Sequence, residues 1–572
     1  MKKQSLLLLL VFGSLSGLFA QKGSWGEFPM IPAKSFAAKA EAAAKIKGTP
    51  AHKKALKVYE RLVEARGDFR YPVPNFYMTN KQTVAEIVYA GPDIFLSEKA
   101  FAVCESFGDQ SEAAIAFLLG HELTHYYEKH AWRKNFASDN RDLTISKQLD
   151  ELYEQMLADS TSQHLRPKLL RFDTLVQQME LIAMEVQSDY LGGFLAYSAG
   201  YGSFRQGDEL IRRLYKEFNI SEASEGYVTR REREEMSQNS AKRMDELVEV
   251  FEMANLLTVV GLYEEAYRFY RKVLVEYQSR EIYNNVGVTA LLQALKYFKE
   301  DELKFRYPIQ LDLDMKNSKT MEADSIRNRL LQQSILQFDA AISLDPGYAP
   351  AYLNKSCALA LLGDSVRAYF YADVEARNVS TGKYAAQIQQ VELILGILEA
   401  QSKTPEEQEK AKARFSALLT TDKSGLAAYN LAILNQETPP AAPELPSGSE
   451  DESIDGKTVF FERYPEEDWK IWVDDALTFH QNTQYTAHSK LFFSRRYGNN
   501  SGLFQITKPN YTGQTSRDIR LGASLKDIEQ KYGPAPRSIQ TPNGQILCYE
   551  QDRILFVLKQ EKLQSWVLYN LL

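Results

Sequence analysis

The HExxH motif at residues 121–125 constrains this chain more than any other feature. It lies in a run of helix-forming residues that starts near Glu112, and positions four apart on a helix face the same side. Both imidazoles can therefore reach one metal ion, with Glu122 directed toward a metal-bound water. Two neutral imidazoles and such a carboxylate are the set that binds Zn²⁺ and accepts a proton from activated water. The chain has seven histidines, so a chance match is rare, on the order of one in a hundred such chains.

A catalytic zinc needs a third protein ligand, and the best candidate lies in a second helical run around residues 184–201. Glu185 and Asp189 are four residues apart there, on one helix face. We expect Glu185 to complete the metal site and Asp189 to accept a hydrogen bond from a ligating histidine, which fixes its tautomer. The alternative is a solvated acidic pair on an amphipathic helix. The predicted site is one Zn²⁺ per chain, bound by His121, His125 and Glu185.

His130 is a weaker candidate ligand. The metzincin pattern HExxHxxGxxH requires glycine at 128 and histidine at 131, where this chain has Glu128 and Ala131. His130 also lies on a different side of the helix from His125, so we interpret it as a non-ligand. The oxyanion-stabilising residue is not selected by spacing, and His164 and Tyr201 are both candidates.

The two motifs together resemble the zinc peptidases of the CAAX prenyl protease and HtpX type. Residues 121–130 read HELTHYYEKH and residues 185–201 read EVQSDYLGGFLAYSAGY, with Ser188 where the family usually has alanine. Residues 84–101 resemble the strand pair that precedes the active-site helix in the family, and the resemblance covers roughly residues 50–235. The 59 residues between His125 and Glu185 disfavour thermolysin-like enzymes, whose spacing is short.

The resemblance implies roles for the residues that match. His121, His125 and Glu185 would bind zinc, and Glu122 would act as general base and then as proton donor to the leaving amine. Asp189 would lie behind the ligands as the second catalytic residue. The chain resembles the soluble periplasmic branch that joins the peptidase to a tetratricopeptide (TPR) tail and acts in outer-membrane protein quality control.

The N-terminus predicts a secretory signal over residues 1–20. Two lysines precede an apolar stretch from Leu6 to Phe19, which is short for a membrane span, and Ala20 ends it. An uncleaved anchor is the alternative. No later segment is apolar enough to span a bilayer, so we expect a mature chain without a transmembrane segment. The short basic-apolar signal and the few cysteines predict a periplasmic location, with association with the outer membrane as one expectation and secretion as the alternative.

The net charge and the cysteine content argue against two classes, nucleic-acid-binding proteins and disulfide-rich proteins. Loss of Lys2 and Lys3 with the signal removes two positive charges, so the formal net charge falls from −7 to −9. That charge disfavours nucleic acid as a partner. The three cysteines, Cys104, Cys357 and Cys548, are too few and too far apart for a disulfide framework.

The predicted architecture of the whole chain is mainly α. Its first part, over residues 21–240, is predicted to be a zinc peptidase domain of the α+β type. Helices are expected over 36–66 and from 109 to about 235, with a capping box of Asp109 and Glu112 before the motif helix. Strands are expected at 75–79, 83–91 and 93–97. Residues 87–89 or 94–96 are candidates for a sheet edge that a substrate could extend, against the alternative of a buried hairpin.

Residues 247–436 predict TPR-like helical repeats. Gly261 and Gly363 each precede an alanine by five residues, and they lie 102 residues apart, which is three times the 34-residue TPR period. Phe338, Ala341 and the segment 345–354 add to the pattern, and a polar insertion near 300–325 interrupts it. A generic helical bundle is the alternative. A TPR array would offer a groove for a protein partner.

The rest of the chain predicts a linker and a small C-terminal domain. Residues 437–455 hold four of the twenty prolines with Ser, Gly and acidic residues, a composition typical of linkers. Residues 456–572 predict a small α+β domain with one helix over 524–533 and strands near 545, 554 and 566. Its helix and trailing strands faintly resemble the SmpA-type outer-membrane assembly lipoproteins.

Two functional hypotheses follow from this pattern. The first is a zinc metalloendopeptidase that cleaves extended or misfolded proteins in the cell envelope, with repeats that recruit clients or partners. The second is a chaperone or scaffold in envelope protein assembly whose zinc domain is latent. A purely structural zinc site is disfavoured because such sites usually close with four Cys or His ligands.

Overall fold

The computed structural model describes residues 46–88, 92–128, 182–220, 229–299, 301–309, 323–422, 424–441, 445–446, 451–459, 466–541 and 544–571, with a few positions between 148 and 175. The predicted signal, His130 and His164 lie outside them. The architecture is mainly α, as predicted, and includes an eight-stranded antiparallel sheet. Among the described residues, no helix is long and apolar enough to cross a membrane.

The N-terminal unit begins with helix α3 (Pro50–Arg66). The Thr49 side chain accepts a hydrogen bond from the His52 N–H at 3.2 Å, and Pro50 occupies the first turn, where its missing N–H costs nothing. The helix ends at Gly67, whose φ of 57° is left-handed. The expected helix is therefore confirmed from Pro50 onward.

A three-stranded sheet follows, in the order β1-β3-β2. Strands β1 (Asn75–Thr79) and β3 (Asp93–Ser97) are parallel, and β2 (Ala85–Val88) pairs antiparallel with β3. Strand β3 is thus central and fully buried, so the interpretation of residues 94–96 as a sheet edge is wrong. Strand β2 is an edge strand, in agreement with the other candidate.

Helices α4 (Glu98–Glu105) and α5 (Ser111–Tyr127) follow the sheet, and α5 carries the HExxH motif. The predicted capping box is not formed. A short 3-10 turn at Gly108–Gln110 includes Asp109, and no side chain caps α5 at its N-cap residue Gln110. The Ser111 hydroxyl instead accepts a hydrogen bond from Lys54 at 2.9 Å.

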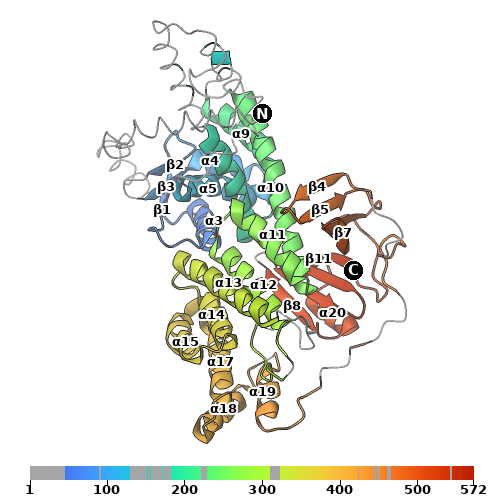
Figure 1. Ribbon diagram of the computed structural model, residues 1–572. Helices are drawn as coiled ribbons and strands as arrows, with labels where there is room; N and C mark the ends of the chain where they lie inside the picture. The colour runs from blue at the N-terminus through green and yellow to red at the C-terminus, as the bar shows by residue number, and fades with distance from the viewer. Residues whose placement is uncertain are drawn as a thin grey trace.

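Residues 182–196 form the second helix of the site, which continues into a π-helical turn, Tyr197–Tyr201. Helices α9 (Gly207–Phe218) and α10 (Arg230–Val259) come next. Thr229 and Glu232 cap α10 reciprocally. The 30 residues of α10 reach about 45 Å, from the N-terminal unit to the C-terminal sheet (Figure 1).

Paired helices follow α10, and each packs against the next. They are α11 (Tyr263–Glu276), α12 (Arg280–Leu295), α13 (Ala323–Leu344), α14 (Ala349–Leu361), the run from α15 (Ser365–Phe370) through a π-helical stretch (Tyr371–Ala376) to α16 (Arg377–Val379), then the 3-10 turn Gly382–Gln387, α17 (Ile388–Ala400), α18 (Pro405–Leu418) and α19 (Leu426–Leu434).

The turns with Gly261 and Gly363 have the same geometry. Both glycines are left-handed, with φ of 85° and 88°, and each turn closes with two hydrogen bonds back to the preceding helix. Ala266 and Ala368 are fully buried at the following helix contact. A second recurrence is a helical glycine beneath a phenylalanine ring, Gly287 under Phe338 and Gly396 under Phe415.

The C-terminal sheet has the order β4-β5-β6-β7-β11-β10-β9-β8. Its strands are β4 (Trp469–Trp472), β5 (Leu477–Asn482), β6 (Ser489–Arg496), β7 (Asn499–Thr507), β8 (Arg537–Thr541), β9 (Gly544–Tyr549), β10 (Ile554–Lys559) and β11 (Lys562–Leu571). Helix α20 (Leu525–Tyr532) is capped by Ser524, as predicted, and covers one face. The other face packs on α10 and α11, where Phe479 meets Phe269 edge to face at 5.4 Å.

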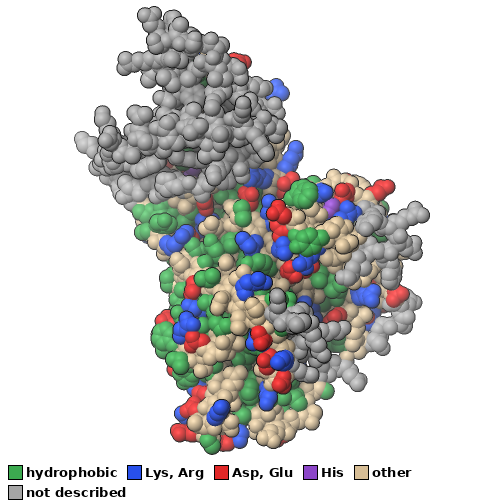
Figure 2. Space-filling model, in the orientation of Figure 1, with side chains coloured by type: hydrophobic (Ala, Val, Ile, Leu, Met, Phe, Trp, Pro, Cys, Tyr) green, Lys and Arg blue, Asp and Glu red, His purple; other side chains and the backbone are tan. Residues whose placement is uncertain are grey.

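Ion pairs surround that contact between the sheet and the helices. Lys490 bonds Glu249 at 2.9 Å, Arg496 bonds Glu264, and Arg537 donates to the carbonyl of Val259 at the end of α10 at 2.8 Å. Lys and Arg side chains are interspersed with Asp and Glu over the face seen in Figure 2. Among the described residues, this face therefore has no broad patch of one sign.

Candidate metal centre

The two helices that carry the motifs touch backbone to backbone. A Cβ added at Gly120 would lie 2.6 Å from the carbonyl oxygen of Gly192, and one added at Gly192 would lie 2.6 Å from the amide nitrogen of His121. Only glycine permits this approach. It places His121, the residue after Gly120, opposite the turn that bears Asp189.

Three side chains converge at this crossing. The Nε2 atoms of His121 and His125 are 3.0 Å apart, and the two carboxylate oxygens of Glu185 lie 3.4 Å and 3.3 Å from them. A tetrahedral zinc with bonds of about 2.0–2.2 Å separates its ligand atoms by roughly 3.3–3.5 Å. The two histidine–glutamate separations match this spacing and the Nε2–Nε2 separation falls slightly short of it, so a small outward shift of the imidazoles would fit a metal ion. Among the described residues these three are the group that could hold one.

Asp189 lies behind the histidines, in the place that the sequence predicted. Its Oδ1 accepts a hydrogen bond from Nδ1 of His121 at 2.9 Å, which leaves Nε2 to face the metal position. The Asp189 side chain is 1% exposed, so it needs further partners. Arg233, from the first turns of α10, supplies them with two hydrogen bonds to the carboxylate and lies 3.5 Å from Glu185.

The electrostatics of the group are dominated by burial and by its own charges. Burial opposes ionisation of Asp189, but the Arg233 guanidinium outweighs it and lowers the pKa of Asp189. Burial acts the same way on Glu185, and hydrogen bonds to the two histidines hold the pKa of Glu185 well below its usual range. Both carboxylates are therefore ionised at neutral pH, the state that binds a cation and orients an imidazole.

The pKa of Glu122 shifts in the opposite direction to those of Asp189 and Glu185. Burial raises the pKa of the Glu122 carboxyl, and the charges of His121 and His125 only partly offset this. A carboxylate whose pKa is raised toward neutrality accepts a proton more readily. Strand β2 packs against α5, so the edge strand lies beside the helix that carries Glu122.

Arg233 is the functional residue that our sequence interpretation missed. The run Arg230-Arg231-Glu232-Arg233 gives no obvious reason to choose one arginine. A signal exists in the helix spacing, because Arg230 and Arg231 have glutamates four residues on and pair with them. Arg233 has Ser237 at that position and must find its carboxylate elsewhere.

Tyr201 is disfavoured as the oxyanion-stabilising residue. Its ring lies under the Arg61 guanidinium at 4.5 Å, and burial raises the pKa of Tyr201 while the Arg61 charge partly offsets this. Tyr201 follows Gly192, which touches Gly120 and the amide of His121, by nine positions, about 13 Å along a helix axis. Tyr201 therefore lies away from the metal centre.

Comparisons with known proteins add no family assignment. No protein-family model matches the sequence, and no curated protein is significantly similar to it.

Proposed function

We propose that the chain is a zinc-dependent metalloendopeptidase. The observation that carries the proposal is the convergence of two histidine nitrogens and a carboxylate within 3.0–3.4 Å of one another, with a second carboxylate next along the helix. Three protein ligands leave the fourth zinc position open, as catalytic sites require. The resemblance of residues 50–235 to the CAAX prenyl protease and HtpX type supports the same assignment.

Each residue has a distinct role in this proposal. Bound zinc would lower the pKa of its water and polarise the scissile carbonyl. Glu122 accepts the proton as the water oxygen bonds to the carbonyl carbon, and then passes it to the leaving nitrogen as the peptide bond breaks. Asp189 and Arg233 keep His121 in the tautomer that presents Nε2.

The substrate in this proposal is an extended polypeptide in the periplasm. Strand β2 is an edge strand beside α5, so a substrate strand could pair with it and cross the metal centre. The repeated glycine turns of the helix pairs support a TPR array as the element that recruits clients or partners. A scaffold with a latent zinc domain is the competing function.

Metal removal tests the proposal. The purified mature chain (residues 21–572) should contain about one zinc by elemental analysis, lose cleavage of an unfolded protein after dialysis against a chelator, and regain it with one equivalent of Zn²⁺. Retained zinc without any cleavage would favour the scaffold. Cleavage that survives complete metal removal would refute the proposed mechanism.

A further inference from the structure

A crevice of about 490 Å³ lies where the N-terminal unit meets the helical repeats. Phe69, in the loop after α3, forms one wall, and the turn between α13 and α14 contributes Asp345 and Gly347. The turn after α16 forms the rest, with residues 378–384. Its volume is in the usual range for ligand sites.

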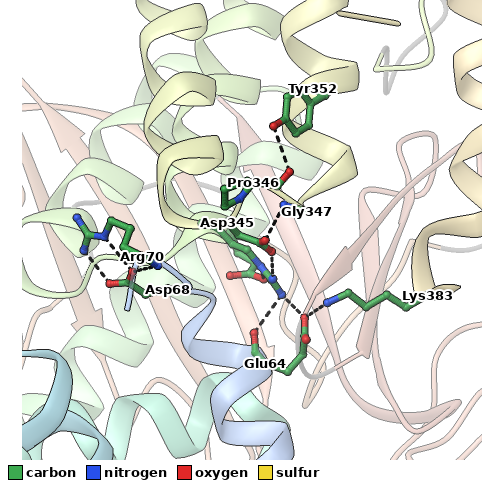
Figure 3. A network of polar contacts seen from close by, with 10 residues as sticks. Glu64, Asp68, Arg70, Asp345, Pro346, Gly347, Tyr352 and Lys383 are labelled. Atoms are coloured by element: carbon green, nitrogen blue, oxygen red, sulfur yellow. Dashed lines mark hydrogen bonds and ion pairs between the residues drawn. The ribbon is translucent and has the colours of Figure 1, made fainter. Parts of the chain in front are cut away.

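The charged side chains of the crevice are already neutralised. Asp345 accepts hydrogen bonds from Arg280 and, at 2.8 Å, from the Gly347 N–H, while Lys383 bonds to Glu64. Figure 3 shows Lys383 and Glu64 directed at each other, and Asp345 beside Gly347. A charged ligand would have to break one of these pairs.

The remaining lining suits an uncharged ligand. Phe69 and Tyr384 supply aromatic surface, and Asn378 and Thr381 are exposed side chains at the rim. In the described part of the chain, neither of these two side chains bonds to another protein group, so both can pair with the backbone of a bound peptide. A large uncharged side chain in the crevice, with its backbone at the rim, would contact the accessible parts of Phe69 and Tyr384, whose rings also lie 5.7 Å from the Arg280 guanidinium and 4.7 Å from the Lys383 ammonium.

The crevice is joined to the metal centre by the loop at residues 67–74. The Tyr126 hydroxyl, one residue beyond His125, donates to the Pro72 carbonyl at 2.8 Å. Chain geometry therefore limits the distance from Phe69 to His125 to about 25 Å, which about seven extended residues can span. Between them along the chain, Tyr71 is 53% and Val73 39% exposed, so the loop carries accessible apolar side chains.

We propose that this crevice binds a large uncharged side chain of an extended polypeptide substrate whose scissile bond lies at the metal centre. The inference rests on the proposed peptidase function and adds a second contact for the substrate. It predicts that substrates long enough to reach both places bind better than short ones.

Binding to the full-length Glu122→Gln chain tests the crevice without turnover. The probe is fluorescein-labelled β-casein, an unfolded protein, followed by fluorescence anisotropy. Thr381→Trp fills the crevice from an exposed position and should weaken binding about tenfold. Gln390→Trp, at an exposed position of α17 outside the crevice, is the matched control and should leave binding unchanged. Equal binding by both variants would overturn the inference.

Competition identifies the ligand chemistry. A Gly-Ser peptide with a central tryptophan should displace β-casein, and the same peptide with lysine or glutamate in its place should not. Displacement by a charged peptide and not by the tryptophan peptide would overturn the inference. In the parent chain, Thr381→Trp should slow β-casein cleavage more than it slows cleavage of a six-residue substrate. If the parent cleaves neither substrate, the peptidase proposal fails, whereas Thr381-dependent binding would still establish the crevice as a peptide site.

Discussion

At the scale of single residues, the metal centre depends on a chain of contacts that ends at Arg233. His121 is oriented by Asp189, and Asp189 is a buried carboxylate that Arg233 holds with two hydrogen bonds. Without the guanidinium, the buried carboxylate would keep His121 as its main partner and would lose its fixed position. In the proposed function, Arg233 would therefore act on a bound metal through Asp189.

Replacement of Arg233 by glutamine should weaken zinc binding by about 10–100-fold, the usual cost of losing an outer-layer partner. Arg231→Gln is the matched control, because Arg231 is 88% exposed and pairs with Glu235 on the same helix. Competition with a chromophoric chelator measures both affinities. Equal zinc affinities in the two variants would contradict this role.

At the scale of elements, the sequence predicted the two site helices and the pairing of Asp189 with a histidine, because period and spacing are local signals. It did not predict how the strands are ordered. The parallel pairing of β1 with β3 makes β3 central, and that choice depends on contacts outside the strand itself. The wrong prediction of a capping box at the start of α5 has a similar cause. The Ser111 hydroxyl there accepts a hydrogen bond from Lys54 of α3, a contact that the local sequence does not indicate.

The helix pairs depend on glycines beneath aromatic rings. A Cβ at Gly396 would lie 2.6 Å from the ring of Phe415 across the α17–α18 contact. Gly396→Ala should therefore destabilise the chain by about 1–3 kcal/mol despite its better helix propensity. Phe415→Leu in the same chain should recover part of this loss, as a double-mutant cycle by chemical denaturation would show. Additive losses would contradict the contact.

The contact between the C-terminal sheet and α11 should depend on pH. Burial opposes ionisation of Asp474, but its hydrogen bonds with Arg268 at 2.7 Å and with backbone N–H groups lower the pKa of Asp474. A lowered carboxyl pKa stabilises the fold above the ordinary value near 4, and this stabilisation is lost as the pH falls through the folded-state pKa.

Asp474→Asn should therefore lower the denaturation midpoint at pH 7, and the difference from the parent should shrink below about pH 4. Asp475→Asn removes the same charge from an exposed neighbour and serves as the control. Urea unfolding at pH 7 and pH 3.5 measures both. A difference that is independent of pH would show that Asp474 contributes only through packing.

At the scale of the whole molecule, one apolar core joins parts that are far apart in the sequence. It includes the N-terminal unit, α10 to α12 and one face of the C-terminal sheet. The composition of residues 437–455 predicted a linker, but nothing in it indicates where the following sheet packs. The ion pair between Arg496 and Glu264 spans 232 positions, and such pairings leave no periodic signal in the sequence.

The N-terminal unit and the helix pairs are joined through α3 and α12. Buried Arg280 at the start of α12 bonds to Glu64 of α3 and to Asp345 beyond α13. Figure 3 shows Glu64 and Asp345 on the two sides of this junction. The substrate path that we infer follows this junction. We therefore expect that catalysis and client binding both require the full chain.

The most direct test of the central claim compares cleavage of β-casein by the full mature chain and by its Glu122→Gln variant, with zinc content measured in both. The account predicts that both chains hold about one zinc and that the variant cleaves about 10²–10⁴ times more slowly, the contribution of a general base. Equal cleavage by two chains with equal zinc would contradict the assignment of Glu122 and the peptidase mechanism with it.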